Sequence, residues 1–93
     1  MLLDIRMHDG SRHFTDVPSV PAPLLRDHLT RMPGAIVTAW LCDGLGECWI
    51  DFTYRDHQFT VNNHWSDFWF FVQDPACPDE VLLEVARYVR NLA

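Results

Sequence analysis

Alternating hydrophobic and polar positions predict a β-hairpin in the second half of the chain. Residues 47–54 and 57–62 both alternate, and Arg55-Asp56 between them has the length of a two-residue turn. This turn predicts the following cross-strand pairs: Tyr54 with His57, Phe52 with Phe59, Ile50 with Val61, Thr53 with Gln58, Asp51 with Thr60, and Trp49 with Asn62. The first three pairs are apolar or aromatic and share one face, whereas the other three are mainly polar, which supports this register.

The N-terminal segment has the pattern of a second hairpin. Residues 2–8 alternate, Asp9-Gly10 is a favoured two-residue turn, and residues 11–17 can return alongside the first segment. This arrangement predicts that Ile5 pairs with Phe14. The pattern leaves open whether the hairpin joins the main sheet.

Two helices are predicted from apolar residues at helical spacing. The first covers about residues 22–32 and ends at Pro33-Gly34. The second covers about residues 78–92. Pro78 suits its first position, and Arg87 and Arg90 suit its C-terminal end, where the helix dipole favours positive charge.

The stretch AIVTAWLC at 35–42 is nearly apolar on both faces, which predicts a strand in the interior of the sheet. Together with the hairpin and a strand at 68–73, it forms a predicted antiparallel meander over residues 35–73. We expect residues 1–93 to form a single domain of the α+β class. In this fold a sheet of four to six antiparallel strands packs against two helices as a two-layer sandwich.

The last predicted strand lies within HWSDFWFFVQ at 64–73 and is apolar on both of its faces. One face can join the core under the helices, and the other places Trp69 and Phe71 beside Trp49. An exposed apolar face with a polar rim is typical of an interaction site. Alternatively, the N-terminal hairpin or the first helix covers these aromatic residues as a second small core. Trp65, in a loop, is either a lid on the core or a contact residue.

The charge distribution narrows the choice of partner. The chain has 13 acidic residues and seven Arg, with no Lys, for a net charge of −6. Residues 43–80 hold eight of the acids and one Arg, so this segment carries most of the negative charge. Such a field repels phosphates and argues against direct nucleic-acid binding. It attracts a basic protein surface and speeds the encounter with it.

Candidate chemistry is sparse in this sequence. Three cysteines without a secretory signal predict free thiols rather than a disulfide framework. The spacing of Cys42 and Cys48 does not match that of structural zinc ligands. Cys77 is surrounded by acidic residues that oppose a thiolate. The carboxylates fit turns and solvated faces, so we expect no metal, no cofactor and no enzymatic activity.

We hypothesise that the chain is a small acidic protein-binding module, a stoichiometric inhibitor that acts on a basic partner. In size and acidity it is similar to bacterial immunity proteins and phage-encoded inhibitors of host defences, although no motif carries this similarity. Carboxylates would steer the approach of the partner, and tryptophans would supply the desolvated anchor. The predicted partner-binding residues are Asp43, Glu47, Trp49, Asp51, Trp65, Asp67 and Trp69.

Two other functions use the same predicted fold. The aromatic face could instead bind a small ligand or a carbohydrate, which requires a concave site. An exposed edge strand could make the chain a structural homodimer. The chain has no apolar run long enough to cross a membrane and no signal-peptide pattern, so we expect a cytoplasmic protein without membrane association.

Overall fold

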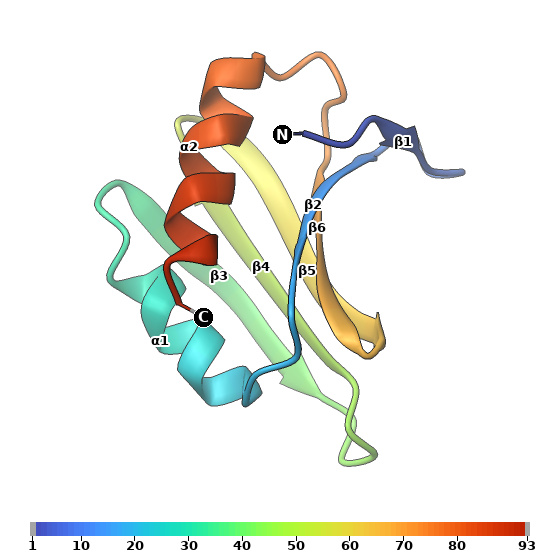
Figure 1. The fold of residues 1–93 in the computed structure, drawn as a ribbon, viewed down its shortest axis with the longest axis vertical. Helices are drawn as coiled ribbons and strands as arrows, with labels where there is room; N and C mark the ends of the chain where they lie inside the picture. The colour runs from blue at the N-terminus through green and yellow to red at the C-terminus, as the bar shows by residue number, and fades with distance from the viewer. Residues whose placement is uncertain (1, 93) are drawn as a thin grey trace.

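The computed structural model describes residues 2–92, apart from the side chain of Trp65. Six antiparallel strands form one sheet, and both helices lie on the same face of it (Figure 1). The elements are β1 Ile5–Arg6, β2 Arg12–Val17, α1 Ala22–Thr30, β3 Ala35–Cys42, β4 Cys48–Tyr54, β5 His57–Trp65, β6 Asp67–Val72 and α2 Asp79–Arg90. The predicted α+β two-layer sandwich is therefore confirmed.

The strand order of the sheet is β1-β2-β6-β5-β4-β3. The N-terminal hairpin joins the predicted meander because β2 pairs with β6. As a result β3 lies at a free edge, and the prediction that residues 35–42 are interior is wrong. One side of β3 is apolar because α1 packs over it. Its other side carries apolar residues that remain exposed, Ile36 and Leu41.

The β4–β5 hairpin has the predicted register at all six pairs. Arg55 and Asp56 form the two-residue turn, with φ angles of 50° and 64°. Positive φ at both central positions is the geometry that matches the right-handed twist of the flanking strands. The short turn and the alternating pattern therefore lead to the same register.

The N-terminal hairpin has a different register because its loop is one residue longer than predicted. The Met7 N–H donates to the Ser11 carbonyl over 2.9 Å, and the Gly10 N–H donates to the Met7 carbonyl over 3.1 Å. These bonds enclose a three-residue loop that ends with Gly10 at a φ of 90°, a conformation that glycine adopts without strain. Ile5 therefore pairs with His13 instead of the predicted Phe14.

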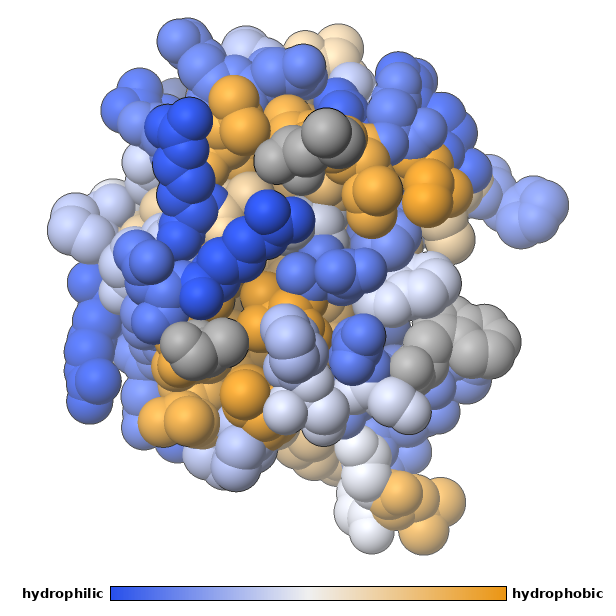
Figure 2. Space-filling model, viewed as in Figure 1, coloured by the Kyte–Doolittle hydropathy of each residue, from blue (hydrophilic) through white to orange (hydrophobic). Residues whose placement is uncertain are grey.

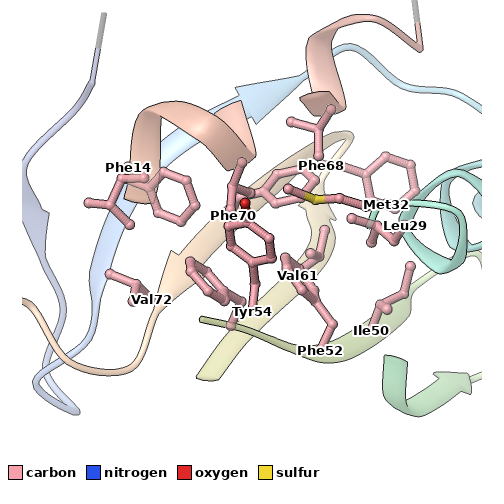
Figure 3. Packing of buried hydrophobic residues seen from close by; sticks show 14 of the residues in the cluster. Phe14, Leu29, Met32, Ile50, Phe52, Tyr54, Val61, Phe68, Phe70 and Val72 are labelled. Carbon is pink, nitrogen blue, oxygen red and sulfur yellow. The ribbon is translucent and has the colours of Figure 1, made fainter. Parts of the chain in front are cut away.

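The hydrophobic core lies between the sheet and the helices, and its aromatic rings meet over the middle of the sheet (Figure 3). On the aromatic strand β6, alternate residues enter this core, as predicted. The largest fully buried side chains are Phe14, Leu25, Leu29, Ile50, Phe52, Phe59, Phe68, Phe70 and Leu82.

Polar contacts connect the two layers at the edges of the core. The Tyr88 hydroxyl donates to the His28 carbonyl over 2.7 Å, and the two rings stack at 4.1 Å, which ties α2 to α1. Arg90 donates to the Thr15 hydroxyl over 2.9 Å and so connects α2 to β2. These bonds satisfy polar groups that would otherwise be costly to bury.

A disulfide joins Cys42 and Cys48 at the facing ends of β3 and β4, with Cα atoms 4.1 Å apart. The prediction of free thiols is therefore wrong for this pair, whereas Cys77 is free and buried. The hairpin places the two cysteines directly opposite one another, within the distance that a disulfide can bridge. The turn that they close projects from the body of the molecule (Figure 2).

Candidate functional site

The sheet face opposite the helices carries three rows of cross-strand neighbours, and we call it the open face. Neighbours in a row have Cα atoms about 4.5–5.5 Å apart. The first row is Leu41, Trp49, Asn62, Trp69 and Asp16; the second is Asp51, Thr60, Phe71 and His13; the third is Thr53, Gln58 and Gln73. The face thus combines aromatic rings with amides, hydroxyls and carboxylates.

Two of the predicted anchors share the first row. Trp49 and Trp69 both pair with Asn62, one from each side, so their backbones are about 10 Å apart. Both side chains are half-buried, and Phe71 in the next row is half-buried as well. Trp69 and Phe71 therefore belong neither to the closed core nor to a fully exposed surface.

His13 packs against the aromatic side chains of β6. It was not among the site residues predicted from the sequence. Its ring stacks on Trp69 with centroids 4.4 Å apart and lies 5.3 Å from Phe71. The residue is only 2% exposed, and neither ring nitrogen has a hydrogen-bond partner among the described residues. Burial lowers the pKa of His13, and the carboxylate of Asp16 opposes this shift in part.

Acidification through about pH 7.5 to 5.5 is expected to lower the free energy of unfolding. The pKa of folded His13 lies below its usual value of 6.5, so the unfolded chain binds more protons in this range. Stability is therefore greatest above the usual pKa and falls as the pH drops. The measurement is the thermal midpoint against pH for the native chain and for His13→Phe, which keeps a ring but does not titrate. Equal pH slopes for the two proteins would contradict this role of His13.

The predicted steering carboxylates divide into two groups. Asp51 lies on the open face, where it accepts a hydrogen bond from the Thr60 hydroxyl over 2.9 Å. Asp43 instead organises the β3–β4 turn, because its carboxylate accepts from the backbone N–H of Leu45 and of Glu47. Asp43 and Glu47 therefore lie at one end of the sheet, away from its centre.

Glu47 pairs with a histidine that the sequence did not single out. Its carboxylate lies 2.7 Å from Nδ1 of His64 on β5. Asn63 strengthens the same corner, because its side chain bonds both the Cys48 N–H and the Gly46 carbonyl over 2.8 Å. These contacts connect the β3–β4 turn to β5.

The last two predicted residues flank the β5–β6 turn. Trp65 and Asp67 are paired in the sheet on either side of Ser66, and Asp67 is exposed. The side chain of Trp65 lies outside the described part of the structure, so its role as an anchor stays a prediction. The β5–β6 turn, which Asp67 follows, lies at the same end of the sheet as the β3–β4 turn (Figure 1).

A groove of about 590 Å³ crosses the open face from the β1–β2 loop to β3. It carries the carboxylates of Asp9 and Asp51, and the pKa of Asp9 is lowered by hydrogen bonds from the side chain and backbone of Ser11. The groove is otherwise lined by Met7, Ser11, Thr38, Phe52, Thr53, Gln58, Phe59, Thr60, Asn62, Phe71 and Gln73. The side chains of Phe52 and Phe59 lie in the core, so the polar side chains in the lining are mostly hydroxyls and amides. Sequence reasoning missed its N-terminal wall because the loop reaches the sheet only through the β2–β6 pairing.

Other kinds of site find less support in the geometry. Burial raises the pKa of the Cys77 thiol, and the carboxylate of Asp74 adds to this, so the thiolate is disfavoured. Among residues 2–92 as described, no three His, Cys, Asp or Glu side chains are grouped so that they could hold a metal ion. Neither of the two helices described is long and apolar enough to cross a bilayer. Comparisons of the chain with protein-family models, curated proteins and solved structures give no match.

Proposed function

We propose that this chain is a small acidic protein-binding module whose open face docks onto a basic protein surface. One observation carries the proposal: Trp49, Asp51 and Trp69 lie together on a sheet face that no described helix covers. The predicted mode of action is that of a stoichiometric inhibitor of the immunity or anti-defence kind.

The aromatic residues supply the means of tight contact. Trp49 and Trp69 are half-buried, so each has surface left to lose to a partner and is already held by its neighbours. The stacking of Trp69 on buried His13 holds its ring in place before binding. A side chain that is already held loses less conformational entropy on binding, which favours its use as an anchor.

The negative charge of the open face favours a basic partner. None of the residues in its three rows or along its groove is an Arg, whereas Asp9, Asp16 and Asp51 are among them. The acidic β3–β4 turn adds Asp43 and Glu47 at one end. A basic surface would therefore meet one sign of charge across the whole face, and this raises the rate of encounter.

Replacing both Trp49 and Trp69 by alanine is expected to weaken partner binding at least about tenfold for each residue. The experiment is affinity capture from a lysate of the source organism or its competitor, followed by calorimetry with the purified partner. The native chain should retain one basic protein at a 1:1 ratio and reduce the activity of that protein. Affinity should also fall between about 0.05 M and 0.5 M salt, because exposed charges are screened.

The matched control is Leu45→Ala, which removes an exposed apolar side chain from the tip of the β3–β4 turn. Circular dichroism shows whether each variant remains folded. The proposal would be contradicted if the folded double variant retained the partner, or if the affinity did not change with salt concentration.

The groove supports a second candidate, the binding of a small polar ligand or a carbohydrate. Its volume lies within the range of ligand pockets, and its hydroxyls and amides suit a ligand rich in hydroxyl groups. Titration of labelled protein with mono- and oligosaccharides distinguishes this candidate. A ligand in the groove should shift the backbone NMR signals of Gln58, Thr60 and Gln73 at millimolar concentration or below. If the protein binds only a protein partner, no saccharide should shift these signals.

The cytoplasmic location stays a proposal. Disulfides persist mainly in oxidising compartments, so the bond between Cys42 and Cys48 does not favour the cytoplasm. Rapid alkylation of the protein in its own cells decides the matter. Three reactive thiols after unfolding support the cytoplasm, whereas a single one, from Cys77, indicates an oxidising compartment.

A further inference from the structure

The strand β3 forms a free edge of the sheet. It is eight residues long, and its outer backbone groups face away from β4. Ile36 and Leu41 are 64% and 62% exposed on this strand. Natural sheets commonly protect such an edge with charged residues, yet β3 contains none.

The other edge of the sheet, formed by β1, is less suited to pair with a further strand. β1 has only two residues in the sheet, and Asp4 and Arg6 give this edge charges that pair with one another at 2.8 Å. A partner strand for β3 is therefore not to be found in the β1 edge of another molecule. This leaves β3 of a second copy as the complementary edge within the same protein.

A bulge makes β3 complementary to itself. Ile36 pairs with Thr53 and Leu41 pairs with Trp49, and these β4 residues are four apart, so both partners share the open face. The register shift between Val37 and Ala39 is what brings Ile36 and Leu41, five residues apart, to one face. Consider a second copy whose β3 runs antiparallel to the first, with the two-fold axis between Thr38 and Ala39. Ile36 of each copy then lies opposite Leu41 of the other.

The same pairing of two β3 strands also matches apolar residues on the helix side and brings no charged residues together. Val37 falls opposite Trp40 of the second copy, and both residues point to the helix side, since they pair with Phe52 and Ile50. Although each chain has a net charge of −6, the paired strands bring no like charges together.

We propose that two copies of this chain form a symmetric dimer by pairing their β3 strands into one continuous twelve-stranded sheet. An isologous contact of this kind closes on itself and leaves no free β3 edge. The disulfide at Cys42 holds the end of β3 against β4, so the edge is ordered before the copies meet. The open faces of both copies stay accessible, so the dimer does not depend on the partner-binding function.

Sedimentation of the native chain from about 1 µM to about 500 µM tests the dimer. We expect the mass to rise with concentration from 10.9 kDa to twice that value and to stop there. Ile36→Lys and Leu41→Lys should each raise the dissociation constant at least about tenfold, because they place charge in the paired edge. The matched control is Ile5→Lys, an exposed apolar residue on the other edge, which should leave the dimer unchanged.

Amide hydrogen exchange gives a second readout that does not depend on these variants. The outward N–H groups of β3 should be protected at high concentration and exchange rapidly at low concentration. A monomer throughout the range, growth of the mass past the dimer, or equal loss of the dimer with Ile5→Lys would overturn the proposal.

Discussion

Replacing Phe70 by alanine is expected to lower the free energy of unfolding by about 3–5 kcal/mol. Phe70 lies on β6 near the middle of the sheet and is fully buried. Its ring meets those of Phe14 and Phe52 edge-on, with centroids 6.4 Å and 6.5 Å away (Figure 3). Removal of the ring leaves a cavity that these neighbours cannot fill without leaving their own rotamers. The total free energy of unfolding of a small domain is only about 5–15 kcal/mol, so the expected loss is a large part of it.

The next residue along the strand provides a matched control. Phe71 points to the open face and is half-buried, so Phe71→Ala should cost about 1–2 kcal/mol, well below the loss at Phe70. Urea unfolding followed by tryptophan fluorescence measures both variants. Equal losses at the two positions would mean that the open face is covered in solution, and would count against its role as an interaction surface.

Removal of the disulfide by Cys42→Ser together with Cys48→Ser is expected to lower the free energy of unfolding by about 2 kcal/mol. The bond closes a short loop between residues six apart and restricts the unfolded chain more than the folded one. The loss should be moderate because Asn63 and the bond from the Asp43 N–H to the Glu47 carbonyl also hold the turn.

A reducing agent is the control for this prediction. It should lower the stability of the native chain by about the same amount and leave the double variant unchanged, because Cys77 makes no disulfide. A native chain that is insensitive to reductant would show that the bond does not contribute. A variant that remains sensitive would point to an unrelated effect of the reductant.

Local signals in the sequence were sufficient for the elements and for one hairpin. The Arg55-Asp56 turn and the strict alternation around it determine the β4–β5 register, since a shift by one residue would place Phe52 and Phe59 on opposite faces of the sheet. This register by itself brings Trp49 and Asp51 to one face. The alternation in β6 adds Trp69, so the centre of the candidate site was predictable.

The position of β3 in the sheet depends on how distant segments meet. Residues 35–42 are apolar on both faces whether the strand is central or at an edge under a helix, and only the pairing of β2 with β6 decides this. The extra loop residue shifts the register of the N-terminal hairpin. The pairing of His13 with Phe71 on β6 places His13 on the open face.

The sequence by itself determined the helices, the strands and the side chains that each would bury, because periodicity and turn chemistry act over a few residues. The tertiary structure decided the strand order, the groove, the stacking of His13 on Trp69 and the exposure of β3. Those features arise from contacts between segments far apart in the chain, where several arrangements satisfy the same local pattern and packing selects one of them.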